Sequence, residues 1–131
     1  MATFYVLRLA TAGLNPVWSG DVGYYSLGIN LGQQDLITHM GSSMGLASPW
    51  RVSSSSWRGD STFYHAVLPH PIDISTRSIP ISIVVMDNAY TAMTGGQPSP
   101  SKSVPIERIT EALGSPTFVI DPSTLRSLWR W

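Results

Sequence analysis

The sequence contains no cysteine among its 131 residues. A chain without thiols forms no disulfide bond, and it supplies no thiolate ligand to a zinc ion or an iron–sulfur cluster. Charge is also scarce, because charged residues make up 12% of the chain and eight basic residues balance eight acidic ones. The basic excess of a nucleic-acid-binding domain is therefore missing, and we expect no nucleic-acid partner.

Long apolar runs and nucleotide-binding signatures are missing as well. No stretch approaches the roughly 20 apolar residues of a membrane-spanning helix. The first residues, Met1-Ala2-Thr3-Phe4-Tyr5, lack the charged region and cleavage site of a signal peptide. We therefore expect no membrane association and a cytoplasmic location. Neither Gly-x-Gly-x-x-Gly nor a P-loop Gly-Lys-Ser/Thr is present, which argues against a nucleotide-binding Rossmann domain.

Apolar residues are plentiful for so short a chain. Hydrophobic residues make up 43% of the sequence, which is long enough for one domain with its own core. We therefore expect residues 1–131 to form a single domain. The polar coat that remains is sparse, so part of the apolar surface is expected to meet another subunit in an oligomer.

Helical and strand-like stretches alternate along the chain. Helices are expected over residues 2–10, from 41–47 onward, over 62–74 (interrupted by Pro69 and Pro71) and over 106–113, which ends at Gly114. Strands are expected at 17–18, 79–86 and 117–120, and residues 94–103 form a Gly-, Pro- and Ser-rich loop. This alternation predicts an α/β fold in three layers, with a mostly parallel sheet and helices on both faces.

Two short stretches carry the strongest functional signal. The first, Gly59-Asp60-Ser61-Thr62-Phe63, is a tight turn, and the second, Val84-Val85-Met86-Asp87-Asn88, is an apolar strand that ends in a carboxylate and a carboxamide. Their separation is that of one β–α–β crossover, which brings both ends to the same edge of a parallel sheet. Carboxylate and amide oxygens suit Mg²⁺ or Ca²⁺, and Mg²⁺ often completes its shell with phosphate and water. The residues therefore predict a metal–diphosphate site.

The segment before Asp60 does not suit a buried strand. It reads Arg51-Val52-Ser53-Ser54-Ser55-Ser56-Trp57-Arg58, which has poor strand propensity and would place polar groups in the sheet. One interpretation is a solvated edge strand or loop. The other is that residues 48–58 are read in a shifted frame, because Ser and Arg codons shifted by one base readily encode Val and Ile.

Five motifs in order resemble a known family. They are Ala2-Thr3-Phe4-Tyr5, Gly20-Asp21-Val22-Gly23-Tyr24-Tyr25-Ser26-Leu27-Gly28, Met40-Gly41-Ser42-Ser43-Met44-Gly45, Gly59-Asp60-Ser61-Thr62-Phe63-Tyr64-His65 and Met86-Asp87-Asn88-Ala89-Tyr90-Thr91-Ala92-Met93-Thr94-Gly95-Gly96-Gln97-Pro98. The chain resembles the thiamine diphosphate-binding domain of 2-oxoacid:ferredoxin oxidoreductases, most closely that of the indolepyruvate ferredoxin oxidoreductase α subunits. The likeness runs from residue 2 to about residue 121 and implies an incomplete thiamine diphosphate-binding fold.

The resemblance assigns roles to individual residues. Asp60 and Asn88 would give side-chain oxygens to Mg²⁺, and Tyr90 would give its backbone carbonyl. The residues implied to lie against the cofactor are Gly20, Asp21, Gly41, Ser42, Ser43, Gly59, Ser61, Met93 and Thr94. Structural roles stay open beside these: Asp60 could cap a helix, and Asn88 and Asp21 could be turn residues.

The resemblance also implies a reaction and its partners. The reaction is the oxidative decarboxylation of an aryl 2-oxo acid such as indolepyruvate, with electrons passing through iron–sulfur clusters to ferredoxin and the acyl group passing to coenzyme A. This sequence lacks the family's cluster-binding cysteines and its pyrimidine-binding part, whose glutamate activates the cofactor. We therefore expect no catalytic residue here and no activity without those other domains or subunits. The alternative is a truncated remnant or assembly module that binds no cofactor.

Overall fold

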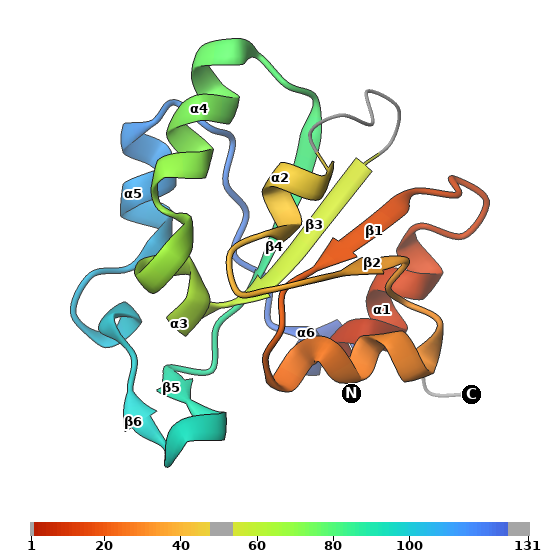
Figure 1. Cartoon of the computed structure of the whole chain (residues 1–131), viewed down its shortest axis with the longest axis horizontal. Helices are drawn as coiled ribbons and strands as arrows, with labels where there is room; N and C mark the ends of the chain where they lie inside the picture. Colours follow the sequence, from red (N-terminus) through yellow and green to blue (C-terminus); the bar gives the residue numbers. More distant parts are fainter. Residues whose placement is uncertain (1, 48–53, 126–131) are drawn as a thin grey trace.

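The computed structural model describes residues 2–47 and 54–125 (Figure 1). Four parallel strands form its sheet in the order β2-β1-β3-β4, with β1 at Val17–Gly20, β2 at Leu36–Ile37, β3 at Ser54–Gly59 and β4 at Ile81–Met86. Beyond β4, the short strands β5 (Tyr90–Thr91) and β6 (Gln97–Pro98) pair antiparallel. The predicted α/β fold with a mostly parallel sheet is confirmed. In the described part of the chain, no helix has the length and apolar character needed to cross a bilayer.

Helices cover both faces of this sheet. Figure 1 shows α4 (Pro69–Arg77) and α5 (Ile106–Ala112) on one side and α1 (Ala2–Ala10) with α6 (Pro122–Leu125) on the other. The remaining helical segments are η1 (Tyr24–Leu31), α2 (Ser43–Ala47), α3 (Asp60–Thr62), η2 (Phe63–Val67), η3 (Ala92–Thr94) and η4 (Pro100–Lys102). The predicted helices at 2–10 and 106–113 are confirmed, and Gly114 ends the latter with a φ of 70°.

The crossover between β3 and β4 runs through consecutive helical segments from Asp60 to Arg77. Pro69 and Pro71 do not break it, because they lie in the first turn of α4, where a backbone N–H has no intrahelical acceptor to lose. A single π-helical stretch, η2, joins the two α-helical parts. The predicted interruption is therefore a change of helical pitch.

Two separate cores fill the space between the layers. On one face, Phe4 of α1 packs with Trp18, Trp57 and Met86 from three strands. On the other face, Met44, Phe63 and Val67 pack against Ile83 and Val85 of β4. This division follows from the strand period of two, since alternate residues of β3 and β4 face opposite sides.

Strand β3 lies in the middle of the sheet, paired with β1 on one side and β4 on the other. Ser55, Ser56 and Arg58 are buried there, and Trp57 is 1% exposed. The interpretation of residues 54–58 as a solvated edge or loop is therefore wrong, because the parallel crossover forces this segment between its neighbours. Residues 48–53 lie outside the described part of the chain, and the shifted-frame hypothesis stays a prediction.

Two further expectations differ from the structure. Residues 117–120 do not form a strand, and Phe118, Val119 and Ile120 are 83%, 80% and 66% exposed. The hydroxyl of Thr117 instead donates to the carbonyl oxygen of Ser115 and to the Thr110 hydroxyl, which holds the chain in a turn beside α5. The predicted loop at 94–103 contains β6 and the helical turn η4.

Candidate functional site

A cavity of about 340 Å³ opens where the strands end, beyond the carboxyl ends of β1, β3 and β4. Gly59 is paired with Met86 in the sheet, so the residues that follow each of them lie at the same edge. Asp60 and Asn88 both line this cavity, as their sequence spacing predicts. The other predicted site residues that line it are Asp21, Gly59, Ser61, Tyr90, Met93 and Thr94.

Asp60 is held rigidly at the first turn after β3. Its side chain is 1% exposed, and its Oδ2 accepts a hydrogen bond of 3.3 Å from the hydroxyl of Ser101. The same hydroxyl lies 2.9 Å from Oδ1 of Asp87. Ser101 therefore joins the carboxylates that follow two neighbouring strands, a contact that sequence spacing alone did not indicate.

Asn88 belongs to a turn that the sequence closes locally. Oδ1 of Asp87 accepts a hydrogen bond from the backbone N–H of Ala89, and Oδ1 of Asn88 accepts one from that of Tyr90. Between them, Ala89 has a φ of 61°, a left-handed conformation that costs a non-glycine residue about 1 kcal/mol or more. The turn interpretation of Asn88 is thus confirmed. Its oxygen keeps a second lone pair, so this turn and a metal-binding role are compatible.

Negative charge gathers beside the cavity. Burial is the main cause that raises the pKa of Tyr64, and the nearby carboxylates of Asp87, Asp60 and Glu107 raise it further. The phenol donates a hydrogen bond to the carbonyl of Val104. A site with this potential favours a cation over a bare anion, so a diphosphate would need a metal ion to bind beside Asp60.

Asp21 forms the wall of the cavity at the end of β1. Its side chain is 5% exposed, and Oδ1 accepts a hydrogen bond of 2.8 Å from the backbone N–H of Ser43 at the start of α2. Oδ2 is buried without a hydrogen-bond partner among the described residues. Nε and Nη1 of Arg58 are likewise buried without partners among the described residues, and Arg58 and Asp21 interact electrostatically.

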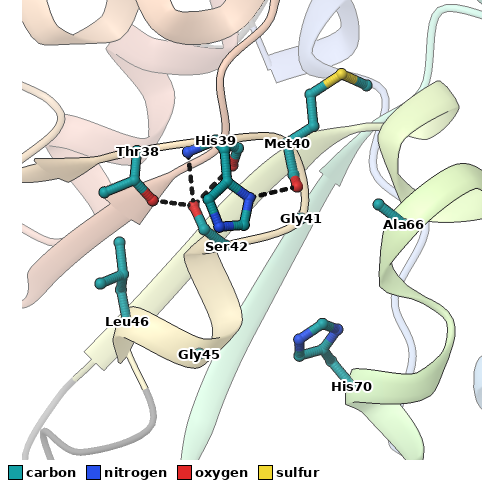
Figure 2. A pocket seen from close by; sticks show the side chains of 9 residues that line it. All are labelled: Thr38, His39, Met40, Gly41, Ser42, Gly45, Leu46, Ala66 and His70. Carbon is teal, nitrogen blue, oxygen red and sulfur yellow. Dashed lines mark hydrogen bonds between the residues drawn. The ribbon is translucent and has the colours of Figure 1, made fainter.

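The remaining predicted residues do not line this cavity. Gly20 is packed under Trp57 and Gln34, where a Cβ atom would lie 2.6 Å from Trp57 Nε1, so glycine is required for close packing. Ser43 is fully buried, and its hydroxyl accepts hydrogen bonds from Ser56 and from Nη2 of Arg58. Gly41 and Ser42 line a second cavity of about 530 Å³, shown in Figure 2.

That second cavity lies between the loop before α2 and the crossover helices. The Ser42 hydroxyl donates to the carbonyl of His39 at 2.7 Å and accepts from the Thr38 hydroxyl, which fixes the loop (Figure 2). His39, in the loop before α2, and His70, in α4, both line this cavity (Figure 2). Sequence reasoning did not indicate that these two histidines line one cavity, because it tested histidines only for ligand spacing along one helix.

The oxygen ligands that the first cavity offers to a metal fit a magnesium diphosphate better than a metal ion held by protein ligands alone. Within residues 2–47 and 54–125, no group of three or more His, Asp or Glu side chains converges on one point. One carboxylate, one carboxamide oxygen and one backbone carbonyl are a small set, and Mg²⁺ bound by few protein ligands takes the rest from phosphate and water.

Comparisons with known proteins agree with this geometry. Residues 15–121 match the family described as "Thiamine pyrophosphate enzyme, C-terminal TPP binding domain". The chain is 35% identical to the indolepyruvate oxidoreductase subunit IorA of Methanothermobacter marburgensis, over 86% of this chain and 22% of that protein. It is 33% identical to the subunit of the same name from Archaeoglobus fulgidus, over 97% of this chain and 23% of that protein. No solved structure matches the chain.

The chain therefore spans less than a quarter of the length of these relatives. The family match covers β1 through the segment after α5, including every residue that lines the cavity at the strand ends. The chain belongs to the C-terminal TPP-binding domain family of thiamine pyrophosphate enzymes.

Proposed function

We propose that the cavity at the strand ends binds the diphosphate of thiamine diphosphate together with Mg²⁺, as part of an indolepyruvate-like 2-oxoacid:ferredoxin oxidoreductase. The observation that carries the proposal is the meeting of Asp60 and Asn88 in one cavity, from the ends of adjacent parallel strands. The relatives, named indolepyruvate oxidoreductase subunits, support the substrate class.

Each residue of the cavity has a task in this proposal. Asp60, the Asn88 carboxamide and the Tyr90 carbonyl would hold the metal, and the hydroxyl of Ser101 donates a hydrogen bond to Oδ2 of Asp60. Ser61, at the first turn of α3, would contact the phosphates, and Met93 and Thr94 would contact the thiamine rings; all three line the cavity. When bound, the cofactor supplies the nucleophilic carbon that a decarboxylation of a 2-oxo acid requires.

The complete reaction needs groups that this chain does not contain. The glutamate that activates the aminopyrimidine and the cysteines that hold iron–sulfur clusters belong to other domains or subunits, and the chain has no cysteine. We therefore infer partners that carry those parts, with ferredoxin as an indirect partner and oxidative decarboxylation to an acyl-CoA as the reaction of the assembly. This assignment makes the chain a cofactor-binding module that is inactive alone.

Calorimetric titration of the 131-residue chain with thiamine diphosphate tests the proposal. We expect saturable binding that requires Mg²⁺, and Asp60→Ala should abolish it because the metal loses its buried carboxylate. Asp73→Ala is the matched control, since Asp73 is an exposed aspartate on α4 that pairs with Arg77. Circular dichroism of each variant shows whether it is folded. Binding that persists in folded Asp60→Ala would contradict the proposed metal site.

A second candidate, a remnant or assembly module without cofactor binding, is favoured by one observation. The central strand β3 carries a buried arginine where apolar side chains usually pack. This burial is expected to lower the stability of the sheet whose strand ends form the cavity. A folded wild-type chain that produces no binding heat with thiamine diphosphate and Mg²⁺ would support this candidate.

A further inference from the structure

The hydroxyl of Ser101 contacts two carboxylates at once. Its Oγ lies 3.3 Å from Oδ2 of Asp60 and 2.9 Å from Oδ1 of Asp87. A serine hydroxyl has one proton to donate, so the two acidic side chains share it. Ser101 is 8% exposed and is not among the described residues that line the cavity at the strand ends. It therefore contacts both carboxylates from outside the cavity lining.

The turn that carries Ser101 is fixed by hydrogen bonds of its own. The backbone N–H of Ser99 donates to the carbonyl of Ala89 at 3.0 Å, and Oγ of Ser99 accepts from the N–H of Ser101 at 3.2 Å. Both serines are buried. Ala89 also donates its N–H to Oδ1 of Asp87. Ser101 is thus anchored to the same turn that contains Asn88, which gives its hydroxyl a defined position.

These bonds limit the carboxylate oxygens that the chain offers to a metal ion. Ser101 engages Oδ2 of Asp60, so among the described residues only Oδ1 of that carboxylate receives no hydrogen bond. Oδ1 of Asp87 is engaged twice, by Ser101 and by the N–H of Ala89. Asp87 is also not among the described residues that line the cavity. The carboxylate contribution is therefore restricted to Asp60, with one of its two oxygens already hydrogen-bonded.

Magnesium and calcium respond differently to so small a set of ligands. Mg²⁺ requires short bonds in near-ideal octahedral geometry and readily keeps water and phosphate oxygens in its shell. Ca²⁺ takes about six to eight oxygens in a more flexible geometry and often binds a carboxylate through both of its oxygens. An additional carboxylate oxygen therefore benefits Ca²⁺ more than Mg²⁺.

We propose that Ser101 is a specificity-determining residue, whose hydroxyl withholds carboxylate oxygens from the metal and so favours Mg²⁺ over Ca²⁺ at this cavity. The inference rests on the proposed binding of thiamine diphosphate together with a divalent cation. Removal of the hydroxyl frees Oδ2 of Asp60 and one lone pair on Oδ1 of Asp87. Both changes add carboxylate acceptors beside the cavity, and both shift the preference toward Ca²⁺.

The readout is the ratio of two dissociation constants for thiamine diphosphate, one measured by calorimetry in excess CaCl₂ and the other in excess MgCl₂. We expect the wild-type chain to bind the cofactor more tightly with Mg²⁺. Ser101→Ala should move the ratio toward Ca²⁺ by about fivefold or more, the effect of one hydrogen bond. Comparison of the ratios removes the diphosphate's own preference between the ions, and a partly unfolded population weakens binding equally with both.

Two further variants separate the hydroxyl from the rest of the side chain and from its surroundings. Ser101→Thr is the conservative variant and should keep the wild-type ratio, because it retains the hydroxyl. Ser103→Ala is the matched control and should also keep it, since Ser103 is an exposed serine that follows η4. Circular dichroism shows whether each variant is folded.

The outcomes distinguish this inference from the proposed function. A folded wild-type chain that binds thiamine diphosphate with neither ion would overturn the proposed function itself. Wild-type binding that is at least as tight with Ca²⁺, an unchanged ratio in Ser101→Ala, or a Ser101→Thr variant that behaves like Ser101→Ala would overturn only the role of Ser101. Loss of binding with both ions in folded Ser101→Ala would also count against it, because Ser101 would then hold the site together without selecting the metal.

Discussion

The hydroxyl oxygens of Ser61 and Thr91 lie 2.6 Å apart and join the first turn after β3 to strand β5. The two residues are 30 positions apart, and Ser61 and Thr91 both line the cavity at the strand ends. This bond ties together the two segments that carry Asp60 and Asn88, which both line the cavity. The shape of the cavity therefore depends on a contact that neither local sequence specifies.

That contact should appear as a coupling energy. We expect Ser61→Ala and Thr91→Val each to destabilise the chain, and the double variant to cost about 1 kcal/mol less than the sum of the single changes, because the bond is lost only once. Urea unfolding of the four proteins measures this cycle. Strictly additive effects would show that the two hydroxyls do not bond in solution.

Arg58 should lower the stability of the fold. Burial lowers its pKa from the ordinary value to about 10, although Asp21 raises it, and the difference corresponds to about 3 kcal/mol at neutral pH. Nε and Nη1 are buried without partners among the described residues. We expect Arg58→Met to increase the free energy of unfolding by about 1–4 kcal/mol, because replacement of a buried ion by an apolar side chain is often stabilising.

The pH dependence of this gain has a defined sign. Because the folded-state pKa of about 10 is below the unfolded value, the unfolded chain binds more protons in a pH window that begins near 10. The wild type therefore gains stability relative to Arg58→Met as the pH rises through that window, and the two midpoints of urea unfolding should converge. A difference that stays constant would show that Arg58 is not buried as a cation.

The two phenylalanines Phe63 and Phe118 allow a matched test of the segment after α5. Phe63 is 1% exposed in the core and Phe118 is 83% exposed. We expect Phe63→Ala to cost about 3–5 kcal/mol of stability and Phe118→Ala to cost less than about 0.5 kcal/mol. Thermal or urea unfolding distinguishes them. A cost above 2 kcal/mol for Phe118→Ala, roughly a half-buried aromatic, would restore the strand that sequence reasoning placed at 117–120.

Gly41 and Gly45 form a second matched pair around α2. Gly41 has a φ of 84°, and a Cβ atom there would lie 2.9 Å from that of Ala66, whereas a Cβ atom at Gly45 has no neighbour within 4 Å. We expect Gly41→Ala to destabilise the fold by about 1–3 kcal/mol. Gly45→Ala should stabilise it by about 0.5–1 kcal/mol, because glycine inside a helix is unfavourable. Equal effects of both changes would contradict this packing of the loop.

The origin of the polar sequence in strand β3 can be tested at the level of the gene. We propose that residues 48–58 arise from a shifted reading frame, because buried serines and an arginine occupy the centre of a parallel sheet whose other strands are mostly apolar. Resequencing the gene should reveal paired insertions or deletions that bound this segment and restore apolar codons. An unbroken native frame through residues 48–58 would rule the proposal out.

Local patterns predicted much of the fold. Three elements could be predicted because each is specified by neighbouring residues. They are the apolar run of β4 (Ile81–Met86), the amphipathic stretch of α1 and the glycine that ends α5. The element at 117–120 was not, since a β-branched run forms a strand only where a sheet edge receives it. At β3 the error was the reverse, because the sequence predicted no buried strand where the structure has one. Pairing with β1 and β4 outweighed the poor strand propensity of its residues.

The candidate site divides in the same way. Sequence spacing alone predicted that Asp60 and Asn88 would lie at the same edge of the sheet, where both line one cavity, because the carboxyl ends of adjacent parallel strands share an edge. Only the tertiary structure decided that Ser101 bridges Asp60 and Asp87, that Gly41 and Ser42 line another cavity, and that one Asp21 oxygen has no partner among the described residues. Those contacts join residues far apart in the chain, and their existence depends on how the layers pack rather than on any local pattern.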